Sequence, residues 1–183
     1  MKEIRSFVHI SFTNDQSAAL MDTKVPIFRK LSEAALEPVR GSPLSAGVDL
    51  KTPYMIRIGP NEQKLCKTDL SVIIPSGFYG QLKERSGLAK NTGYQVKAGV
   101  IDRDYTGNIG VIIRNTGPNA LFFDVGDVIV QMVFIKCLEY KSYGILEYDE
   151  RYELPETSPP LIRYVRNTVH EERGNQGFGS TSN

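Results

Sequence analysis

The sequence predicts an all-β sandwich or barrel, and three observations lead to that prediction. After Pro43 the chain is a succession of short runs rich in Val, Ile, Tyr and Phe, which are residues that favour strands. Turn-forming residues separate these runs at intervals of about 8–12 residues, the spacing typical of sandwiches and barrels. No stretch supplies the crossover helices that a parallel α/β sheet needs.

The expected strands follow in order from these runs. Residues 25–31 (VPIFRKL) alternate into a first strand, and one helical turn over 32–36, capped by Ser32, follows and ends before Pro38. Clusters such as Gly59-Pro60 and Gly117-Pro118-Asn119 mark the later turns. The remaining strands are expected at 48–52, 54–58, 63–69, 71–74, 77–82, 94–101, 109–115, 120–123 and 128–137.

Length and charge bound the class of protein. With 183 residues, the chain fits one domain with appendages. It carries 22 Lys and Arg against 21 Asp and Glu, a net charge of +1, and has no charge block that would favour nucleic acid or a membrane surface. No apolar run reaches about 18 residues, and the N-terminus lacks a signal-peptide pattern. An intracellular protein, cytoplasmic or nuclear, is therefore expected.

The chain has too few cysteines and histidines for a fold stabilised by several disulfides or by zinc. Cys66 and Cys137 lie far apart, so the sequence leaves one disulfide open but excludes a framework of disulfides. With only His9 and His170 and no Cys/His cluster, a structural zinc site is not expected.

Composition divides the chain into four regions. Residues 1–22 are expected to be an N-terminal appendage and 23–138 the β-rich core. Residues 139–172 are rich in tyrosine and charge and are interrupted by PETSPP (155–160), so an extended arm is expected there. Residues 173–183 form a glycine-rich end.

The stretch 99–113 (GVIDRDYTGNIGVII) is expected to form a β-hairpin with a long polar loop. Asp102, Asp104 and Tyr105 lie at the mouth of that loop. In one interpretation the two acids are turn-formers that bond their own backbone. In the other, Asp102 is a carboxylate at the edge of a pocket walled by hairpin backbone.

Two polar residues interrupt otherwise apolar strands. Asp49 stands in the strand start AGVDL, and a carboxylate there must be paired, hydrogen-bonded or linked to a metal. Gln131 interrupts the longest apolar run, VIVQMVFIKCL, so its amide is either satisfied within the core or faces a site.

Two glycine-containing segments offer donors to an anion. Arg85 and Ser86, followed by glycine, can donate to phosphate oxygens. The C-terminal RGNQGFGSTSN either is disordered or forms an anion-binding loop. In the second case Arg173 and the hydroxyls after the last glycine would donate, and Phe178 would offer a flat face to a base.

Taken in order, five of these segments resemble the five motifs of the trimeric dUTPase family. They are AGVDL, RSGLA, GVIDRDYTGN, GDVIVQ and RGNQGFGST, and the resemblance spans roughly 25–183. It implies a jelly-roll-like β-barrel with a flexible glycine-rich C-terminal arm, assembled as a homotrimer with shared active sites. The implied reaction is hydrolysis of dUTP to dUMP and pyrophosphate with Mg²⁺, which limits uracil in DNA and supplies dUMP for thymidylate synthesis.

The resemblance also implies a role for each matching residue. Asp102 would be the base that activates the water attacking the α-phosphorus, Tyr105 would pack against the deoxyribose, and Asp49 would reach Mg²⁺ through water. The implied substrate-binding residues are Arg85, Ser86, Gly87 and Gln131 for the phosphates, Gly99, Val100, Ile101 and Gly110 for uracil, and Arg173, Phe178, Gly179, Ser180 and Thr181 in the closing C-terminal motif.

Several positions depart from the family pattern. Glu84 stands where the family usually has proline, which puts an acid beside the phosphate site. Lys97 replaces a small residue, Val128 an arginine and Gln176 a glycine, and the segment 139–172 is longer than expected. Two alternatives stand beside this interpretation. One is a dCTP deaminase-like enzyme of the same fold, and the other is a dUTPase-derived regulatory protein that binds nucleotide and meets a partner through the N-terminal appendage or 139–172.

Overall fold

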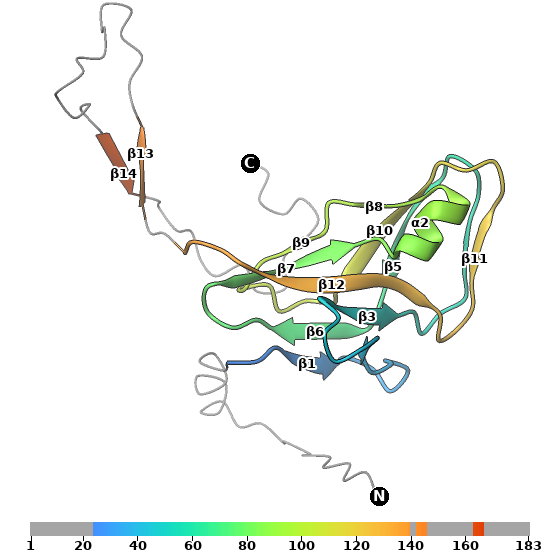
Figure 1. Ribbon diagram of the computed structural model, residues 1–183, viewed down its shortest axis with the longest axis horizontal. Coiled ribbons are helices and arrows are strands. Elements are labelled where there is room, and N and C mark those ends of the chain that lie inside the picture. The colour runs from blue at the N-terminus through green and yellow to red at the C-terminus, as the bar shows by residue number, and fades with distance from the viewer. Residues whose placement is uncertain (1–23, 140–141, 146–162, 167–183) are drawn as a thin grey trace, which may run out of the picture.

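Short antiparallel strands form a jelly-roll-like β-barrel, as expected for an all-β chain (Figure 1). The computed structural model describes residues 24–139, 142–145 and 163–166. The strands of the barrel are β1 (Ile27–Lys30), β2 (Val39–Arg40), β3 (Gly47–Lys51), β4 (Ile56–Ile58), β5 (Gln63–Lys67), β6 (Leu70–Ile73), β7 (Phe78–Lys83), β8 (Tyr94–Lys97), β9 (Val100–Ile101), β10 (Gly110–Asn115), β11 (Leu121–Phe123) and β12 (Val128–Lys136). Between β7 and β8 lies the helix α2 (Ser86–Thr92).

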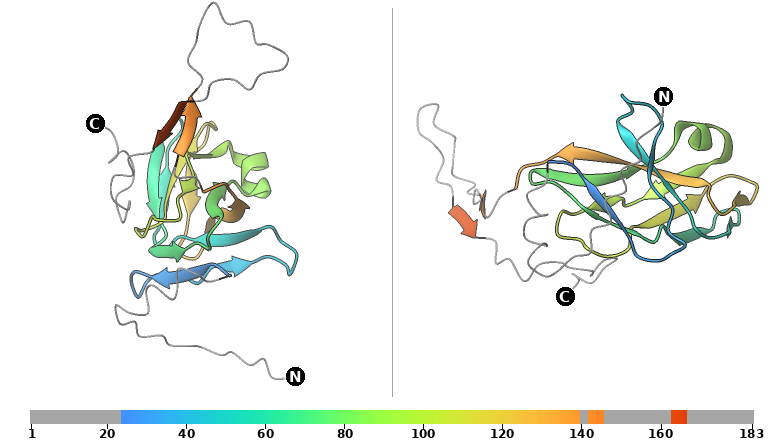
Figure 2. Two further views of the ribbon diagram at one scale, coloured as in Figure 1. Left: turned by 90° about the vertical axis from the view of Figure 1, so that its left-hand side faces the viewer. Right: turned by 90° about the horizontal axis from the view of Figure 1, so that it is seen from below.

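The strands are arranged in one larger sheet and several smaller ones. The five-stranded sheet has the order β2-β3-β12-β7-β9, and the three-stranded sheet has the order β5-β10-β8. The pairs β1-β6 and β11-β4 extend the wall of the barrel. Figure 2 shows the strands curving around a common interior, with α2 on the outside.

The interior is mainly aliphatic. Each fully buried Val, Leu, Ile or Met side chain stabilises the fold by roughly 1.5–3 kcal/mol. Strand β10 shows the expected period of two, with Val111 and Ile113 fully buried and Ile112 and Arg114 half-buried. Among the described residues, the fully buried aliphatic side chains are Leu50, Ile58, Leu70, Ile74, Ile109, Val111, Ile113, Ile129, Val130 and Met132.

A β-bulge in β12 decides where its one polar residue points. The register against β3 shifts between Val128 and Val130, so Ile129 and Val130 are both buried. Past the bulge the alternation resumes with Met132 in the core and Gln131 on the opposite face. The bulge therefore lets an almost continuous apolar strand present an amide to a site.

The expected strand 94–101 is broken, and the expected hairpin partner of 99–101 is wrong. Ala98 and Gly99 have φ values of 57° and 91°, in the left-handed region that ends a strand. Before the break β8 pairs with β10; after it β9 pairs with Gly80 and Gln81 of β7. The Leu82 N–H donates to the Gly99 carbonyl at 2.7 Å, which fixes the new direction.

The helical elements also differ from expectation. Residues 32–36 form only a turn, and the Ser32 hydroxyl donates to Asp69 at 2.7 Å instead of capping a helix. Helix α2 lies between the strands expected at 77–82 and 94–101, where the sequence predicts no helix. It ends at Gly93, whose φ of 67° makes it a typical C-terminal glycine.

Outside the barrel, the structure describes one pair of strands. Strands β13 (Ser142–Ile145) and β14 (Arg163–Arg166) pair antiparallel within the segment expected to be an arm. The division of the chain into 1–22, 23–138, 139–172 and 173–183 stays a prediction. No helix among the described residues has the length and apolarity needed to cross a bilayer.

Both cysteines are free thiols. Cys66 is buried, and this burial raises the pKa of its thiol to about 11. The thiol therefore stays protonated and unreactive near neutral pH.

Candidate active site

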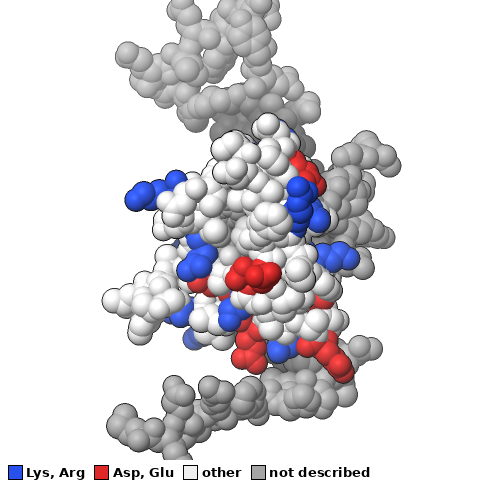
Figure 3. Space-filling view, turned by 90° about the vertical axis from the view of Figure 1, so that its right-hand side faces the viewer, with Lys and Arg blue, Asp and Glu red and all other residues white. Residues whose placement is uncertain are grey.

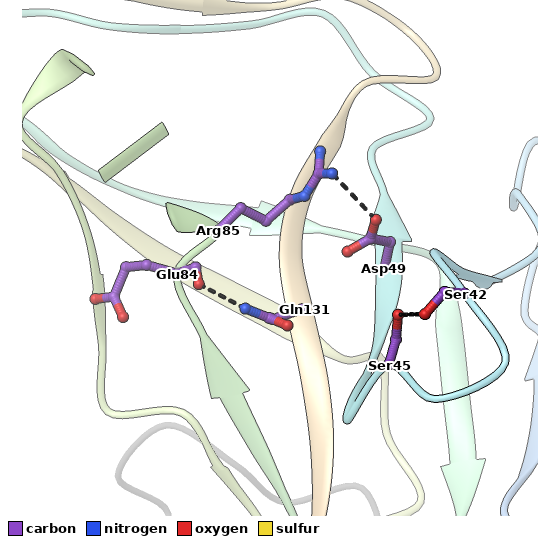
Figure 4. A network of polar contacts seen from close by, with 6 residues as sticks. All are labelled: Ser42, Ser45, Asp49, Glu84, Arg85 and Gln131. Atoms are coloured by element: carbon purple, nitrogen blue, oxygen red, sulfur yellow. Dashed lines mark hydrogen bonds and ion pairs between the residues drawn. The ribbon is translucent and has the colours of Figure 1, made fainter. Parts of the chain in front are cut away.

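A polar cavity of about 480 Å³ opens on the outer face of the five-stranded sheet. Strands β3 and β12, the start of α2 and the loop 41–46 form its walls (Figure 4). Its lining residues are Gly41, Ser45, Gly47, Asp49, Arg85, Ser86, Gly87, Leu88, Asn91 and Gln131. Five of them, Asp49, Arg85, Ser86, Gly87 and Gln131, are residues that the sequence singled out.

Strand register brings the two polar strand residues together. Asp49 of β3 and Gln131 of β12 are directly opposite, so both side chains lie on the same face of the sheet. Arg85, at the N-cap position of α2, reaches Asp49 with an Nη2–Oδ2 distance of 3.4 Å. The Arg85 side chain is 46% exposed, and ion pairs this open stabilise a fold by at most about 1 kcal/mol. The guanidinium can therefore turn to an incoming anion at little cost.

Gln131 is held from two sides. Its Nε2 donates to the Glu84 carbonyl at 2.8 Å. A Cβ at Gly47 would lie 2.7 Å from its Oε1, so glycine is needed at position 47 to leave room for the amide. The amide nitrogen carries a second N–H, which is the donor available to a ligand in the cavity.

The loop 41–46 forms a wall of the cavity that was not predicted from the sequence. Both Nε and Nη2 of Arg40 donate to the Ser45 carbonyl, at 2.9 and 2.7 Å. The hydroxyls of Ser42 and Ser45 are 2.9 Å apart. Asn91, from the last turn of α2, was also missed. For the loop 41–46, the turn-forming composition was the only signal in the sequence.

The Glu84 carboxylate does not enter the cavity. Its Oε1 accepts a hydrogen bond from the Val96 N–H at 2.8 Å. In Figure 4 the carboxylate points away from Arg85 and Asp49. This acid therefore ties β8 to the end of β7 and faces neither Arg85 nor Asp49.

A second group of expected site residues lies on the loop between β9 and β10. The Tyr105 N–H donates to the Asp102 carbonyl at 3.1 Å, and the Tyr105 hydroxyl donates to the Asn108 carbonyl at 2.8 Å. Tyr105 is only 8% exposed, and burial raises the pKa of its phenol. A Cβ at Gly107 would lie 2.6 Å from the Tyr105 hydroxyl, so the ring packs closely on glycine.

The strands that flank this loop are separated from each other. Strand β9 pairs with β7, and Gly110 of β10 pairs with β5. The ladder between β8 and β10 ends at the Lys97–Ile112 pair, so among the described strands Gly110 has a neighbour on one side only. Lys97 itself turns outward and donates to Gln95 at 2.8 Å.

The remaining expected residues divide between these two groups and the rest of the chain. Neither Asp102 nor Tyr105 lines the cavity. Val100 is 55% exposed and Ile101 is buried. The five residues of the C-terminal motif, Arg173, Phe178, Gly179, Ser180 and Thr181, lie outside the described residues.

Charge and metal-ligating groups are spread thinly over the described part of the molecule. On the face shown in Figure 3, basic and acidic side chains are interspersed. Within residues 24–139, 142–145 and 163–166, no three His, Cys, Asp or Glu side chains are grouped so that they could hold a metal ion.

Comparisons with known proteins agree with this geometry. The chain matches the dUTPase family over residues 34–182. It is 40% identical over 154 residues to the deoxyuridine 5'-triphosphate nucleotidohydrolase of Mus musculus, covering 84% of this chain and 83% of the relative. The solved dUTPase of Staphylococcus bacteriophage 80alpha is 25% identical, with a TM-score of 0.62 over 72% of this chain and 99% of that chain.

A second solved structure bears on the metal. The dUTPase of phage phi11 of S. aureus is 26% identical, with a TM-score of 0.61 over 70% of this chain and 98% of that chain, and it is described with a structural Mg(II) ion. The family match covers most of the chain. A relative that is 40% identical over 84% of the chain agrees with it, as does the barrel fold. The chain belongs to the dUTPase family.

Proposed function

We propose that this chain hydrolyses dUTP to dUMP and pyrophosphate by attack of water on the α-phosphorus, with Asp102 as the base. The single observation that carries the proposal is the polar cavity in which Asp49, Arg85 and Gln131 converge on the outer face of the sheet. Its donors suit a triphosphate, and the family is one of nucleotide hydrolases.

Each group has a role that its chemistry supports. Arg85 supplies a forked charge for phosphate oxygens, and Ser86 and Gly87 supply the first N–H groups of α2, which have no acceptor within the helix. Gln131 donates its second N–H near the α-phosphate. Asp102 positions a water and takes its proton as the new P–O bond forms, while the bond to the bridging oxygen breaks and pyrophosphate leaves.

The second group would select the nucleoside. Backbone donors and acceptors of Gly99, Val100, Ile101 and Gly110 would pair with uracil, and cytosine would leave buried groups unpaired at a cost of about 1–3 kcal/mol each. The buried ring of Tyr105 would exclude a 2′-hydroxyl. We assign the closing role over the phosphates and base to Arg173, Phe178, Gly179, Ser180 and Thr181, as the family pattern implies.

The residues of the cavity fit Mg²⁺ bound mainly by substrate. Mg²⁺ usually keeps several waters and takes one or two carboxylates plus phosphate oxygens, so a protein cage is not needed. Asp49 is a carboxylate on the cavity wall, 3.4 Å from Arg85. Through water, it would hold the ion that neutralises charge on the phosphates when bound.

We further propose a homotrimer in which the cavity of one subunit meets the Asp102 loop of another. The support is that Asp102 and Tyr105 do not line the cavity of their own chain. A head-to-tail interface repeated around a threefold ring would bring the two groups together three times.

Pyrophosphate release tests the reaction. The protein with Mg²⁺ is supplied separately with dUTP, dCTP, dTTP and UTP, and release restricted to dUTP is expected. In isotopically labelled water the heavy oxygen should appear in dUMP and not in pyrophosphate, because the attack is on the α-phosphorus. Tight binding of dUTP without release would support the regulatory alternative, and release from dCTP would contradict the proposed base selection.

A further inference from the structure

The loop that carries Asp102 and Tyr105 is anchored at its C-terminal end to the corner between β5 and β6. The Thr68 hydroxyl donates to the Ile109 carbonyl at 2.9 Å, and the Ile109 N–H donates to the Leu70 carbonyl at 2.7 Å. These bonds hold the end of the loop against residues about forty positions earlier in the chain.

Asp69 is the centre of this anchor. Its φ of 55° lies in the left-handed region, which aspartate tolerates better than most residues, and the residue is 5% exposed. The Asp69 N–H donates to Asn108 Oδ1 at 3.1 Å, and Asn108 Nδ2 donates back to Asp69 Oδ1 at 2.8 Å. The left-handed backbone allows the peptide N–H and the carboxylate of one residue to engage both ends of the same amide.

The other oxygen of Asp69 is fixed by two hydroxyls. Ser32 Oγ and Tyr54 OH each donate to Asp69 Oδ2 at 2.7 Å. Burial alone would raise the pKa of Asp69, but the hydrogen bonds from Tyr54, Ser32 and Asn108 outweigh it and lower the pKa. Asp69 therefore stays ionised near neutral pH as an acceptor of three side-chain hydrogen bonds.

The hydrogen bonds continue from Asp69 into the loop. Asn108, held at both ends of its amide, offers its backbone carbonyl to the Tyr105 hydroxyl at 2.8 Å. The Tyr105 N–H in turn donates to the Asp102 carbonyl. These contacts join buried or half-buried groups and form a continuous path of hydrogen bonds from the Asp69 carboxylate to the loop.

We propose that Asp69 is a positioning residue for dUTP hydrolysis, which through Asn108 sets the orientation of Tyr105 and the Asp102 loop. This inference rests on the proposed function, since it assumes that Asp102 activates water and that Tyr105 excludes the 2′-hydroxyl. Asp69 does not line the cavity, so its removal would act through the position of the loop. Misplacement by about 1 Å can lower a rate about 100-fold.

The substitution Asp69→Asn tests the proposal. It sets an amide donor against the Asn108 amide donor, and kcat for dUTP should fall about 10- to 100-fold with KM little changed. The ratio of kcat/KM for dUTP over that for UTP should fall as well, because a looser Tyr105 no longer excludes the 2′-hydroxyl. The exposed turn residue Asp124 provides the matched control Asp124→Asn, which should behave as wild type.

The exchange variant Asp69→Asn/Asn108→Asp gives the sharpest readout. In it, the new amide at 69 donates to the new carboxylate at 108, and its oxygen still accepts from Ser32 and Tyr54. The carboxylate at 108 still accepts the N–H of residue 69. Rescue of kcat and of dUTP selectivity to near wild type is therefore expected. Tyr54→Phe removes one hydrogen-bond donor to Asp69 at a side chain that is 46% exposed, so this variant should fold. Its kcat should also fall, but by less than that of Asp69→Asn.

The outcomes separate this inference from the proposed function. If wild type releases no pyrophosphate from dUTP, the proposed function fails. If wild type is active and Asp69→Asn matches it in kcat and selectivity, the positioning role is overturned. The positioning role is also overturned if Asp69→Asn is folded and slow and the exchange variant is equally slow. In that case the hydrogen bonds are restored but the catalytic rate is not.

Discussion

The two regions that we assign to dUTP hydrolysis are held in different ways. In the cavity, the ion pair between Arg85 and Asp49 is 3.4 Å long and Arg85 is 46% exposed, so the phosphate-binding groups are loosely tied. On the loop, the buried Tyr105 is hydrogen-bonded to Asn108, which is fixed by Asp69. A charged ligand can reorganise the first region by its own binding energy. The second must be oriented in advance, since a base works only within hydrogen-bond reach of its water.

The largest effect should come from removing the base. Asp102→Asn keeps the shape of the side chain but not its basicity, so kcat for dUTP should fall about 10²- to 10⁴-fold with unchanged affinity for dUTP. Steady-state pyrophosphate release and calorimetric titration measure the two quantities. Asp104→Asn, in the same loop, is the matched control and should remain active. The reverse ranking of the two variants would show that the loop had been assigned wrongly.

Arg85→Ala should instead weaken binding. A hydrogen bond to a charged group contributes about 1.5–3 kcal/mol, so the dissociation constant for dUTP should rise about 10- to 150-fold. Arg57→Ala removes another surface arginine, one that lies over the Phe122 ring, and should not affect dUTP binding. A fall in kcat at unchanged affinity would remove the distinction between the two regions.

Gly47→Ala tests the packing beneath the cavity. The new Cβ would lie 2.7 Å from Gln131 Oε1, so the amide must move and its bond to the Glu84 carbonyl must weaken. We expect a loss of about 1–3 kcal/mol in stability and a rise in KM for dUTP. In the matched Gly41→Ala, the nearest atom is Ser45 Oγ at 3.5 Å, an ordinary contact, so Tm should be unchanged. Equal melting temperatures in all three proteins would contradict this account.

The anchor on the loop side should depend on pH. The pKa of Asp69 is lowered from 3.8 by folding, so its contribution to stability is present above that pH and is lost on acidification. The pKa of Tyr54 is raised from 10.0, chiefly by its hydrogen bond to Asp69, so its contribution is lost in alkali above that pH. Denaturant titrations from acid to alkaline pH should show both losses in wild type and smaller ones in Asp69→Asn. Identical profiles would contradict the anchor.

The smallest effect should come from Glu84. Glu84→Gln keeps an oxygen to accept the Val96 N–H, so stability should change little and KM for dUTP should stay the same. Glu84→Ala leaves that N–H without its partner and should cost about 1 kcal/mol in urea unfolding. A clear fall in KM on neutralising Glu84 would mean that the acid repels the phosphates after all.

Much of the fold and of the cavity could be predicted from the sequence, because it follows from local patterns. Apolar runs and turn residues placed most strands within a few residues, and Asp49 and Gln131 stood out as polar residues in apolar strands. Helix α2 escaped notice because none of its seven residues is buried, so it has no apolar period. The break after Lys97 was missed because Ala98 carries no signal of a left-handed backbone.

What could not be predicted depends on contacts between distant segments. Asp69 follows a strand in an ordinary Thr-Asp pair, and its role becomes visible only when Ser32, Tyr54 and Asn108 converge on it. The room that Gly47 leaves for Gln131 likewise follows from the register of β3 against β12. Neither relation has a local pattern in the chain.

Mixing two impaired variants, assayed with dUTP well below the dissociation constant of Arg85→Ala, tests most directly whether the two regions form one site between subunits. Arg85→Ala has an intact loop and Asp102→Asn an intact cavity, so one of the three sites in every mixed trimer would combine both intact parts. The variants are co-expressed with different tags, and complexes carrying both tags are isolated and assayed for pyrophosphate release from dUTP. We predict activity well above that of either variant alone. Mixed complexes no more active than the parent variants would contradict the shared site.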